Sequence, residues 1–317
     1  MESDTQVGGI VKSDNRKMRT NKTSSRIFLV TILAIPIIHW LVFWFYVNVQ
    51  SIALAFMHVR TGEFTWINFK TFWDSLTSPI GNTIGVAVKN TFLFFGLHIL
   101  VTMPLSLVIA FFLYKRILGY KFFRVMFYMP AIISAVAMTA AFKEFIAPNG
   151  PLGRIVKFFG GEIPYEGMLN NFKYATVAII IYCIWTGFTR DVLLFGGGMS
   201  RIPIEVLESA KLEGCGPGNE ILKIVLPLIW PTVSTQIVFI FTGMFGAGGP
   251  ILLLTNGSYN TTTVAFWIFQ QVYGDGSVGG SGIYNNVSCA GLCFTLVGVP
   301  VILFIKWLMG KVDSVEY

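Results

Sequence analysis

A charged segment, Glu205–Pro227, interrupts a chain that is otherwise mostly apolar, and its residue types suit contacts with another protein. Pro203 presets the backbone angle of a first helical turn and Gly214 is a stop signal, which predicts a helix of about ten residues between them. One face of this helix is apolar and its flank is charged. The apolar positions are Ile204, Leu207 and Ala210, and the charged ones are Glu205, Glu208 and Lys211. A helix this short cannot cross a membrane, so we interpret it as a handle for a soluble partner.

The segment continues into a second expected helix. Gly216–Gly218 breaks the chain, and Asn219 is placed to cap a helix that leads to Pro227. The stretch from Arg201 to Lys223 is slightly acidic, whereas helices that bind anionic lipid are usually basic. Its charge therefore favours docking against a protein over docking on lipid.

Residue types that carry catalysis or bind metals are sparse. His39 and His98 have no second ligand at helical spacing, so we interpret them as hydrogen-bonded interior or interface residues. The 4 cysteines show no disulfide or zinc spacing. The sequence contains no G-x-x-x-x-G-K-[ST], the loop that cradles the phosphates of ATP. We therefore expect no catalytic residue, no metal site and no cofactor in this chain.

The composition is that of a membrane protein. Of 317 residues, 54% are hydrophobic and only 12% are charged, and the mean hydropathy is +0.67. Such a chain cannot keep its apolar surface inside one water-soluble core. The net charge of +7 comes from Lys and Arg residues at the ends of apolar runs and not from one patch, which argues against nucleic acid as a partner.

A helix needs about 20 largely apolar residues to cross a bilayer. Residues 1–26 form a polar, basic tail, and the apolar run behind it is too long for a cleaved signal peptide. The segments that qualify as spans are about 27–49, 86–113, 124–146, 174–196, 229–254 and 286–308.

The distribution of Lys and Arg orients these expected spans. The tail and the link 115–124 are basic, and the last segment holds Lys306 and Lys311, so both termini, including a C-terminal tail at 309–317, are expected in the cytoplasm. With six spans, the charged segment at 201–227 then also lies in the cytoplasm.

Two features of the expected spans go beyond what a passive anchor requires. Thr242–Pro250 is rich in Gly, which permits either close helix packing or a broken helix beside a translocation path. Arg190 and Asp191 end the fourth span near its cytoplasmic side, so the interpretation we favour is an interface anchor, with a functional role as the alternative.

The charged segment resembles the cytoplasmic signature of the permeases of binding-protein-dependent ABC importers, specifically the carbohydrate uptake group. That signature is an EAA triplet, a Gly after three residues, then nine residues and I-x-L-P. Its positions fall here on Glu208, Ser209, Ala210, Gly214, Ile224, Leu226 and Pro227, with Ser209 as the sole replacement.

Further pieces resemble the sugar permease pattern over about residues 85–308. They are Asn90-Thr91, Tyr128-Met129-Pro130, Trp185, Ile202-Pro203, Tyr284-Asn285-Asn286 and Ser288–Leu292. One departure is that Asn256-Gly257-Ser258 stands where the group often has Gly-Gly-Pro, so analogy does not predict the outer end of span five.

The resemblance implies an all-α membrane protein with the type I ABC importer permease fold. It would lie in the bacterial cytoplasmic membrane, with one transmembrane domain at 27–308 and a coupling loop at 201–227. It further implies a heterodimer with a second permease, two cytoplasmic ATPase subunits that bind ATP and Mg, and an extracytoplasmic binding protein that delivers a carbohydrate such as an oligosaccharide. ATP-driven movement of the ATPases would switch the path between outward and inward access.

Roles for individual residues follow from this scheme. Contact with an ATPase is expected at Glu205, Glu208, Ser209, Ala210, Gly214 and Pro227. Sugars are bound by aromatic faces and neutral hydrogen-bonding groups. The candidates for the substrate path on spans four and five are Trp185, Phe188, Gln236, Phe241, Thr242 and Phe245, with ordinary helix packing as the alternative for each.

Other function classes stay open at this point. A permease of the same fold could carry a non-sugar solute. A secondary transporter would often show an internal repeat, which is not evident here. A membrane enzyme would need an acid–base or metal constellation, against which the sparse His and carboxylates argue.

Overall fold

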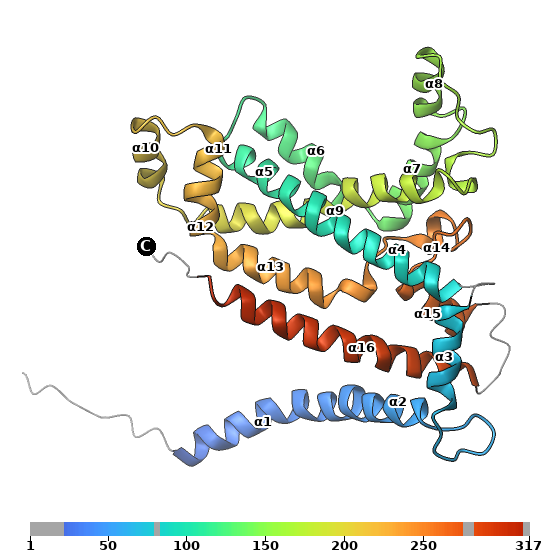
Figure 1. Ribbon diagram of the computed structural model, residues 1–317. Coiled ribbons are helices and arrows are strands. Elements are labelled where there is room, and N and C mark those ends of the chain that lie inside the picture. Colours follow the sequence, from blue (N-terminus) through green and yellow to red (C-terminus); the bar gives the residue numbers. More distant parts are fainter. Residues whose placement is uncertain (1–21, 79–82, 275–281, 313–317) are drawn as a thin grey trace, which may run out of the picture. The chain divides into compact units, whose positions relative to one another are not determined.

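The computed structural model describes residues 22–78, 83–274 and 282–312 (Figure 1), and these residues are helical apart from turns, loops and one isolated bridge between Met57 and Phe64. The chain divides into two compact units, residues 1–53 and 54–317. Most of the expected basic tail, residues 1–21, and the terminal residues 313–317 lie outside the described residues.

The first unit is a single helical rod. It consists of α1 (Lys22–Trp40), the π-helical η1 (Leu41–Tyr46) and the start of α2 (Val47–Ala55). The continuous helix Arg26–Ala55 is 30 residues long, which exceeds the roughly 20 needed to cross a bilayer. Trp40 stacks on Trp44 with ring centroids 5.3 Å apart.

The second unit is a bundle in which α5 packs on α9, α9 on α13 and α13 on α16 (Figure 1). Its helices are α3 (Ile67–Thr77), α4 (Thr83–Leu97), η2 (His98–Thr102), α5 (Met103–Tyr114), α6 (Tyr120–Ile132), α7 (Ala135–Ile146), α8 (Pro151–Phe158), η3 (Met168–Asn170), α9 (Ala175–Met199), α10 (Ile204–Leu212), α11 (Pro217–Asn219), η4 (Glu220–Val225), α12 (Leu226–Leu228), α13 (Trp230–Thr242), η5 (Met244–Gly246), α14 (Ile251–Leu254), α15 (Val264–Tyr273) and α16 (Gly282–Met309). α8 and α10 lie at opposite ends of this bundle (Figure 1).

Four helices of the described residues are long and apolar enough to cross a membrane: Arg26–Ala55, Thr83–Tyr114, Ala175–Met199 and Ile283–Met309. Two bent helix pairs bring the number to as many as six. The six spans expected from the sequence are the upper end of this range, and the bent pairs differ from the straight spans expected at 124–146 and 229–254.

Span three is bent because its helix stops and restarts. Tyr120–Ile132 meets the following helical stretch at an angle of 111°. Ile133 and Ser134 are extended, and the Ser134 hydroxyl accepts a hydrogen bond from the backbone N–H of Ala137, which caps α7. A serine at this position favours a new helix start over continuation of the old one.

Span five is not one helix over 229–254. α13 ends at Thr242, a short 3-10 turn follows, and Gly248 and Gly249 have positive φ angles before α14 begins. The glycines adopt backbone angles that other residues rarely reach. The broken helix that the Gly-rich run suggested is therefore confirmed. Close packing, the other interpretation, holds here as well, because a Cβ at Gly248 or Gly249 would lie 2.5 Å from the side chain of Thr263 or Cys183.

Candidate coupling helix and polar core

The expected short helix is α10, and it presents two different faces. Leu207 and Ala210 are buried, and Leu207 belongs to an apolar cluster with residues of α9 and α13. Glu205, Glu208 and Ser209 are exposed, and Leu212 is 90% exposed. One face thus anchors α10 to the bundle while the other is open to a partner.

Gly214 ends α10 in the way the sequence predicted. Its φ of +77° is left-handed, the backbone N–H of Gly214 donates to the Lys211 carbonyl, and that of Cys215 donates to the Ala210 carbonyl. This pair of bonds is the Schellman arrangement that closes a helix at a glycine. A Cβ at Gly214 would meet nothing within 4 Å, so the backbone angle and not crowding requires glycine here.

The helix after α10 begins earlier than expected. Asn219 does not cap it, because α11 already starts at Pro217 with Gly216 as the N-cap; proline favours the first helical position, where no N–H is needed. The segment then runs through η4 and α12 and bends by 80° into α13. Pro227 and Pro231 flank this bend, and proline removes the backbone donor that a straight helix would use.

An ion pair ties this segment to α5. The ammonium of Lys115 contacts Oε2 of Glu220, whose side chain is only 1% exposed. Oε1 of Glu220 has no hydrogen-bond partner among the described residues. A buried carboxylate is tolerated only when a cation compensates it, so Lys115 holds the start of η4 against the end of α5.

A polar cluster joins three helices inside the bundle. Nε2 of His98 on η2 lies 3.0 Å from Oδ2 of Asp191 on α9, and the Gln236 side-chain amide on α13 donates to Asp191 Oδ1 at 2.6 Å. Asp191 is 1% exposed. The interface-anchor interpretation is therefore wrong for Asp191, while Arg190 beside it is exposed. The hydrogen-bonded role expected for His98 is confirmed.

A cavity of about 270 Å³ lies next to the break that follows α13. It is lined from three directions, by His98 and Thr102 of η2, by Thr186 and Gly187 of α9, and by Gly246–Gly249. Backbone groups freed by the break thus border a space that also holds side-chain hydroxyls and an imidazole. Irregular backbone at membrane depth is tolerated where it is buried in protein or lines a wet cavity.

None of the six residues that the sequence indicated for a substrate path lines this cavity. Phe188 and Gln236 are buried; Phe188 packs on Phe127. Thr242 is exposed and donates to the carbonyl of Val238 in its own helix.

The remaining three are partly accessible aromatic rings. Trp185 is 38% exposed beside Tyr182. Phe241 packs edge-on against Phe95, and Phe245 lies 4.9 Å from Phe294 between ring centroids. The cavity residues Thr186 and His98 were not among the candidates. The sequence signal for His98 was Thr102, a second polar residue one helical turn further along the same apolar span.

The Asn90-Thr91 pair has a structural role at the opposite end of the bundle from α10. The Asn90 amide donates to the carbonyls of Asn260 and Thr262 at 2.6 and 2.9 Å, and the Thr91 hydroxyl accepts from the backbone N–H of Val264 at 2.9 Å. These bonds hold the loop before α15, where Gly257 has a φ of +73°.

The fold, the accessible helix α10 and the cavity beside the broken span together define a class of protein. It is a helical membrane chain with a broken span beside a cavity and a short accessible helix at one end. The family model described as binding-protein-dependent transport system inner membrane component matches residues 102–314. The chain belongs to this family and is an inner-membrane protein.

Individual relatives support the same grouping. The chain is 24% identical over 294 residues to the multiple sugar-binding transport system permease protein MsmF of Streptococcus mutans, covering 91% of this chain and 98% of that protein. It is 24% identical over 237 residues to the polygalacturonan/rhamnogalacturonan transport system permease protein YteP of Bacillus subtilis, covering 72% of each. A chain in the crystal structure of a bacterial ABC transporter that imports the acidic polysaccharide alginate superposes with a TM-score of 0.77 at 21% identity, covering 93% of this chain and 99% of that one. The fold is therefore that of a type I ABC importer permease.

Proposed function

We propose that this chain is the permease subunit of an ATP-driven importer for a carbohydrate, and that α10 is its coupling helix. The observation that carries the proposal is the geometry of α10. The signature residues Glu208 and Ser209 are exposed, Ala210 faces the bundle and Gly214 ends the helix. A soluble ATPase would grip the exposed face, and Leu207 would transmit its movement to α9 and α13.

The proposed orientation places α10 and both termini in the cytoplasm. The basic residues of the α5–α6 link lie at the same end of the bundle as α10 (Figure 1), as the positive-inside rule requires of a cytoplasmic face. A partner must then supply ATP and Mg binding, since the sequence has no P-loop. An extracytoplasmic binding protein would deliver the solute at the α8 end.

We assign the substrate path to the cavity beside the break. Its 270 Å³ is below the roughly 300–1,000 Å³ that encloses a drug-sized ligand, so this chain alone cannot enclose an oligosaccharide. A second permease would complete the site, which fits a heterodimer. Thr186 and the backbone of Gly246–Gly249 offer hydrogen-bonding groups to a sugar.

Carbohydrate is the substrate class that the relatives' names favour. The class is tested by purifying the native complex and measuring ATP hydrolysis with different loaded binding proteins. Stimulation by a glycan-loaded binding protein is expected. Stimulation by an amino-acid-loaded binding protein alone would overturn the sugar assignment and leave the permease assignment standing.

Docking at α10 is tested with two equally exposed leucines at the same end of the bundle. Leu212 on α10 is 90% exposed and Leu118 in the α5–α6 link is 99% exposed. We expect Leu212→Glu to abolish co-purification of the ATPase and Leu118→Glu to preserve it, with both variants inserted in the membrane. Full ATPase association in Leu212→Glu would exclude the proposed docking face.

A further inference from the structure

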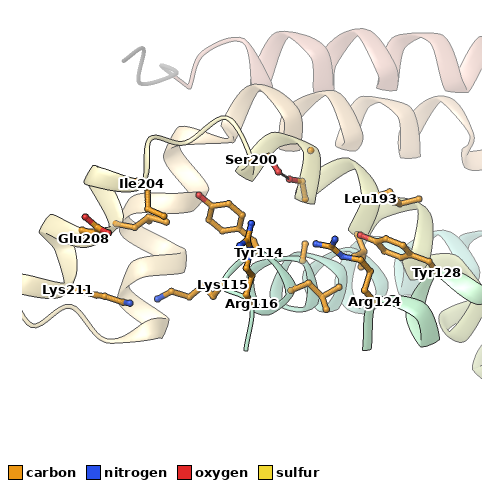
Figure 2. Close-up of a pocket in the computed structure, with 16 residues that line it drawn as sticks. Tyr114, Lys115, Arg116, Arg124, Tyr128, Leu193, Ser200, Ile204, Glu208 and Lys211 are labelled. Carbon is orange, nitrogen blue, oxygen red and sulfur yellow. Dashed lines mark hydrogen bonds between the residues drawn. The ribbon is translucent and has the colours of Figure 1, made fainter. Parts of the chain in front are cut away.

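A cavity of about 670 Å³ lies between α10 and the ends of α5, α6 and α9. Its charged lining is mostly basic, with Lys115 and Arg116 after α5, Arg124 on α6 and Lys211 on α10 (Figure 2). Glu208 is the one acidic residue that lines it. The volume is within the range of sites that enclose small ligands.

The cations of this cavity are poorly compensated. Within the part of the chain that the structure describes, Lys115 pairs with Glu220, whereas Arg116, Arg124 and Lys211 form no ion pair. Figure 2 shows the side chains of Lys115 and Lys211 pointing toward one another. Like charges that face each other repel, and an anion bound between them would offset this repulsion.

The shape of the cavity leaves room for such an anion. Gly196 and Gly197 form part of the α9 wall, and a Cβ at either position would meet nothing within 4 Å. Tyr128 also lines the space, whereas the hydroxyls of Tyr114 and Ser200 donate to the carbonyls of Ile202 and Gly196. Open space at the two glycines beside several cations is a suitable surround for a group with many acceptor oxygens.

We propose that this cavity binds a phosphate group of an anionic ligand, either a lipid headgroup or a soluble sugar phosphate. Three cations without a carboxylate partner exceed what the two oxygens of one carboxylate satisfy. About two charges and at least three acceptor oxygens are carried by the phosphate monoester of a sugar phosphate, or by the two phosphodiesters of a cardiolipin headgroup together. Basic pockets between membrane helices are suited to phospholipid headgroups. Because Lys211 of α10 lines the cavity, a bound phosphate would also hold α10 against the bundle.

Binding is measured directly, so it does not depend on which solute the complex transports. The full-length chain, with its co-purifying subunits, is placed in phosphatidylcholine nanodiscs with or without cardiolipin, and retained lipid is counted by native mass spectrometry. In a second arm, glucose 6-phosphate is titrated calorimetrically into the complex in phosphatidylcholine alone. Retention of cardiolipin supports the lipid source, and binding of glucose 6-phosphate supports the soluble source.

Two α6 residues of equal charge provide the matched variants. Arg124 lines the cavity and Lys121 does not. Arg124→Gln is expected to weaken binding about fivefold, the effect of about one basic residue near an anionic headgroup, and Lys121→Gln is expected to leave it unchanged. Equal binding by these two variants, or no binding of either probe to the unmodified chain, would overturn the proposal.

A variant that keeps every charge separates binding in the cavity from attraction to a basic surface. Gly197→Leu would place a side chain in the open space that Gly197 leaves, and the exposed position tolerates a better helix former. We expect loss of the phosphate ligand with an unchanged melting temperature in phosphatidylcholine. Undiminished binding by Gly197→Leu would place the anion outside the cavity and refute the assignment.

Discussion

The hydrogen bond between Gln236 and Asp191 should be a measurable link between α13 and α9. Gln236→Leu removes the donor of the 2.6 Å bond and leaves Asp191 with His98 as its partner. A hydrogen bond to a charged group contributes about 1.5–3 kcal/mol in soluble proteins, whereas polar pairs between membrane helices average about 0.6 and reach about 1.7 kcal/mol. Since Asp191 is 1% exposed, we expect a coupling free energy near the upper membrane value, about 1.5 kcal/mol.

The assay is a double-mutant cycle on the free energy of unfolding. Gln236→Leu, Asp191→Leu and the double variant are unfolded with denaturant in mixed micelles and followed by far-UV circular dichroism. Thr242→Val is the control partner for Asp191→Leu, because the Thr242 hydroxyl bonds to its own helix and distant sites add within about 0.5 kcal/mol. A Gln236–Asp191 coupling no larger than that of the control would refute the role assigned to this bond.

Three further predictions concern other contacts in the bundle. Lys115→Met should lower the free energy of unfolding by about 3–5 kcal/mol, because it leaves the buried Glu220 carboxylate without a cation. The double variant Lys115→Met, Glu220→Leu should recover most of this loss. A double variant no more stable than Lys115→Met alone would contradict the prediction. Gly214→Ala should cost about 1–2 kcal/mol through its left-handed backbone alone, measured as a lower denaturation midpoint than that of Gly218→Ala, which has an ordinary backbone and the same open space. Asn90→Leu removes two bonds to the loop before α15, so limited proteolysis should cut this loop faster while the rest of the bundle stays resistant; an unchanged cleavage rate would argue against the bracing role.

The coupling helix was the feature best predicted from the sequence because its signals are local. Pro203 and Gly214 bound the helix through their own backbone preferences, and the structure gives α10 as Ile204–Leu212. Of the apolar face expected at Ile204, Leu207 and Ala210, the last two are buried, but Ile204 is 63% exposed because it lies in the first turn, away from the bundle contact. Each of these inferences needs only the residue and its neighbours along the chain. The contact of this helix with an ATPase stays a prediction.

Features that depend on distant partners were predicted poorly. Asp191 was interpreted as an interface anchor because it lies near the end of a span in the sequence. Its carboxylate is instead buried, because His98 and Gln236, from helices far away in the sequence, are its hydrogen-bond partners. The bend in span three likewise depends on a serine cap that apolar periodicity does not reveal. Hydrophobicity gives the number of spans, but straight spans cannot be told from broken ones by that signal alone.

The two cavities share one wall, and this relation is not visible in the sequence. α9 is an unbroken helix of 25 residues, about 37 Å long at 1.5 Å per residue. Its first half lines the cavity beside the break with Thr186 and Gly187, and its last turns line the basic cavity beside α10 with Gly196 and Gly197. Because an unbroken helix moves as a rigid element, a displacement of α10 that shifts the end of α9 would also reach the cavity beside the break. A ligand in the basic cavity would therefore restrain the same helix that the proposed transport cycle has to move.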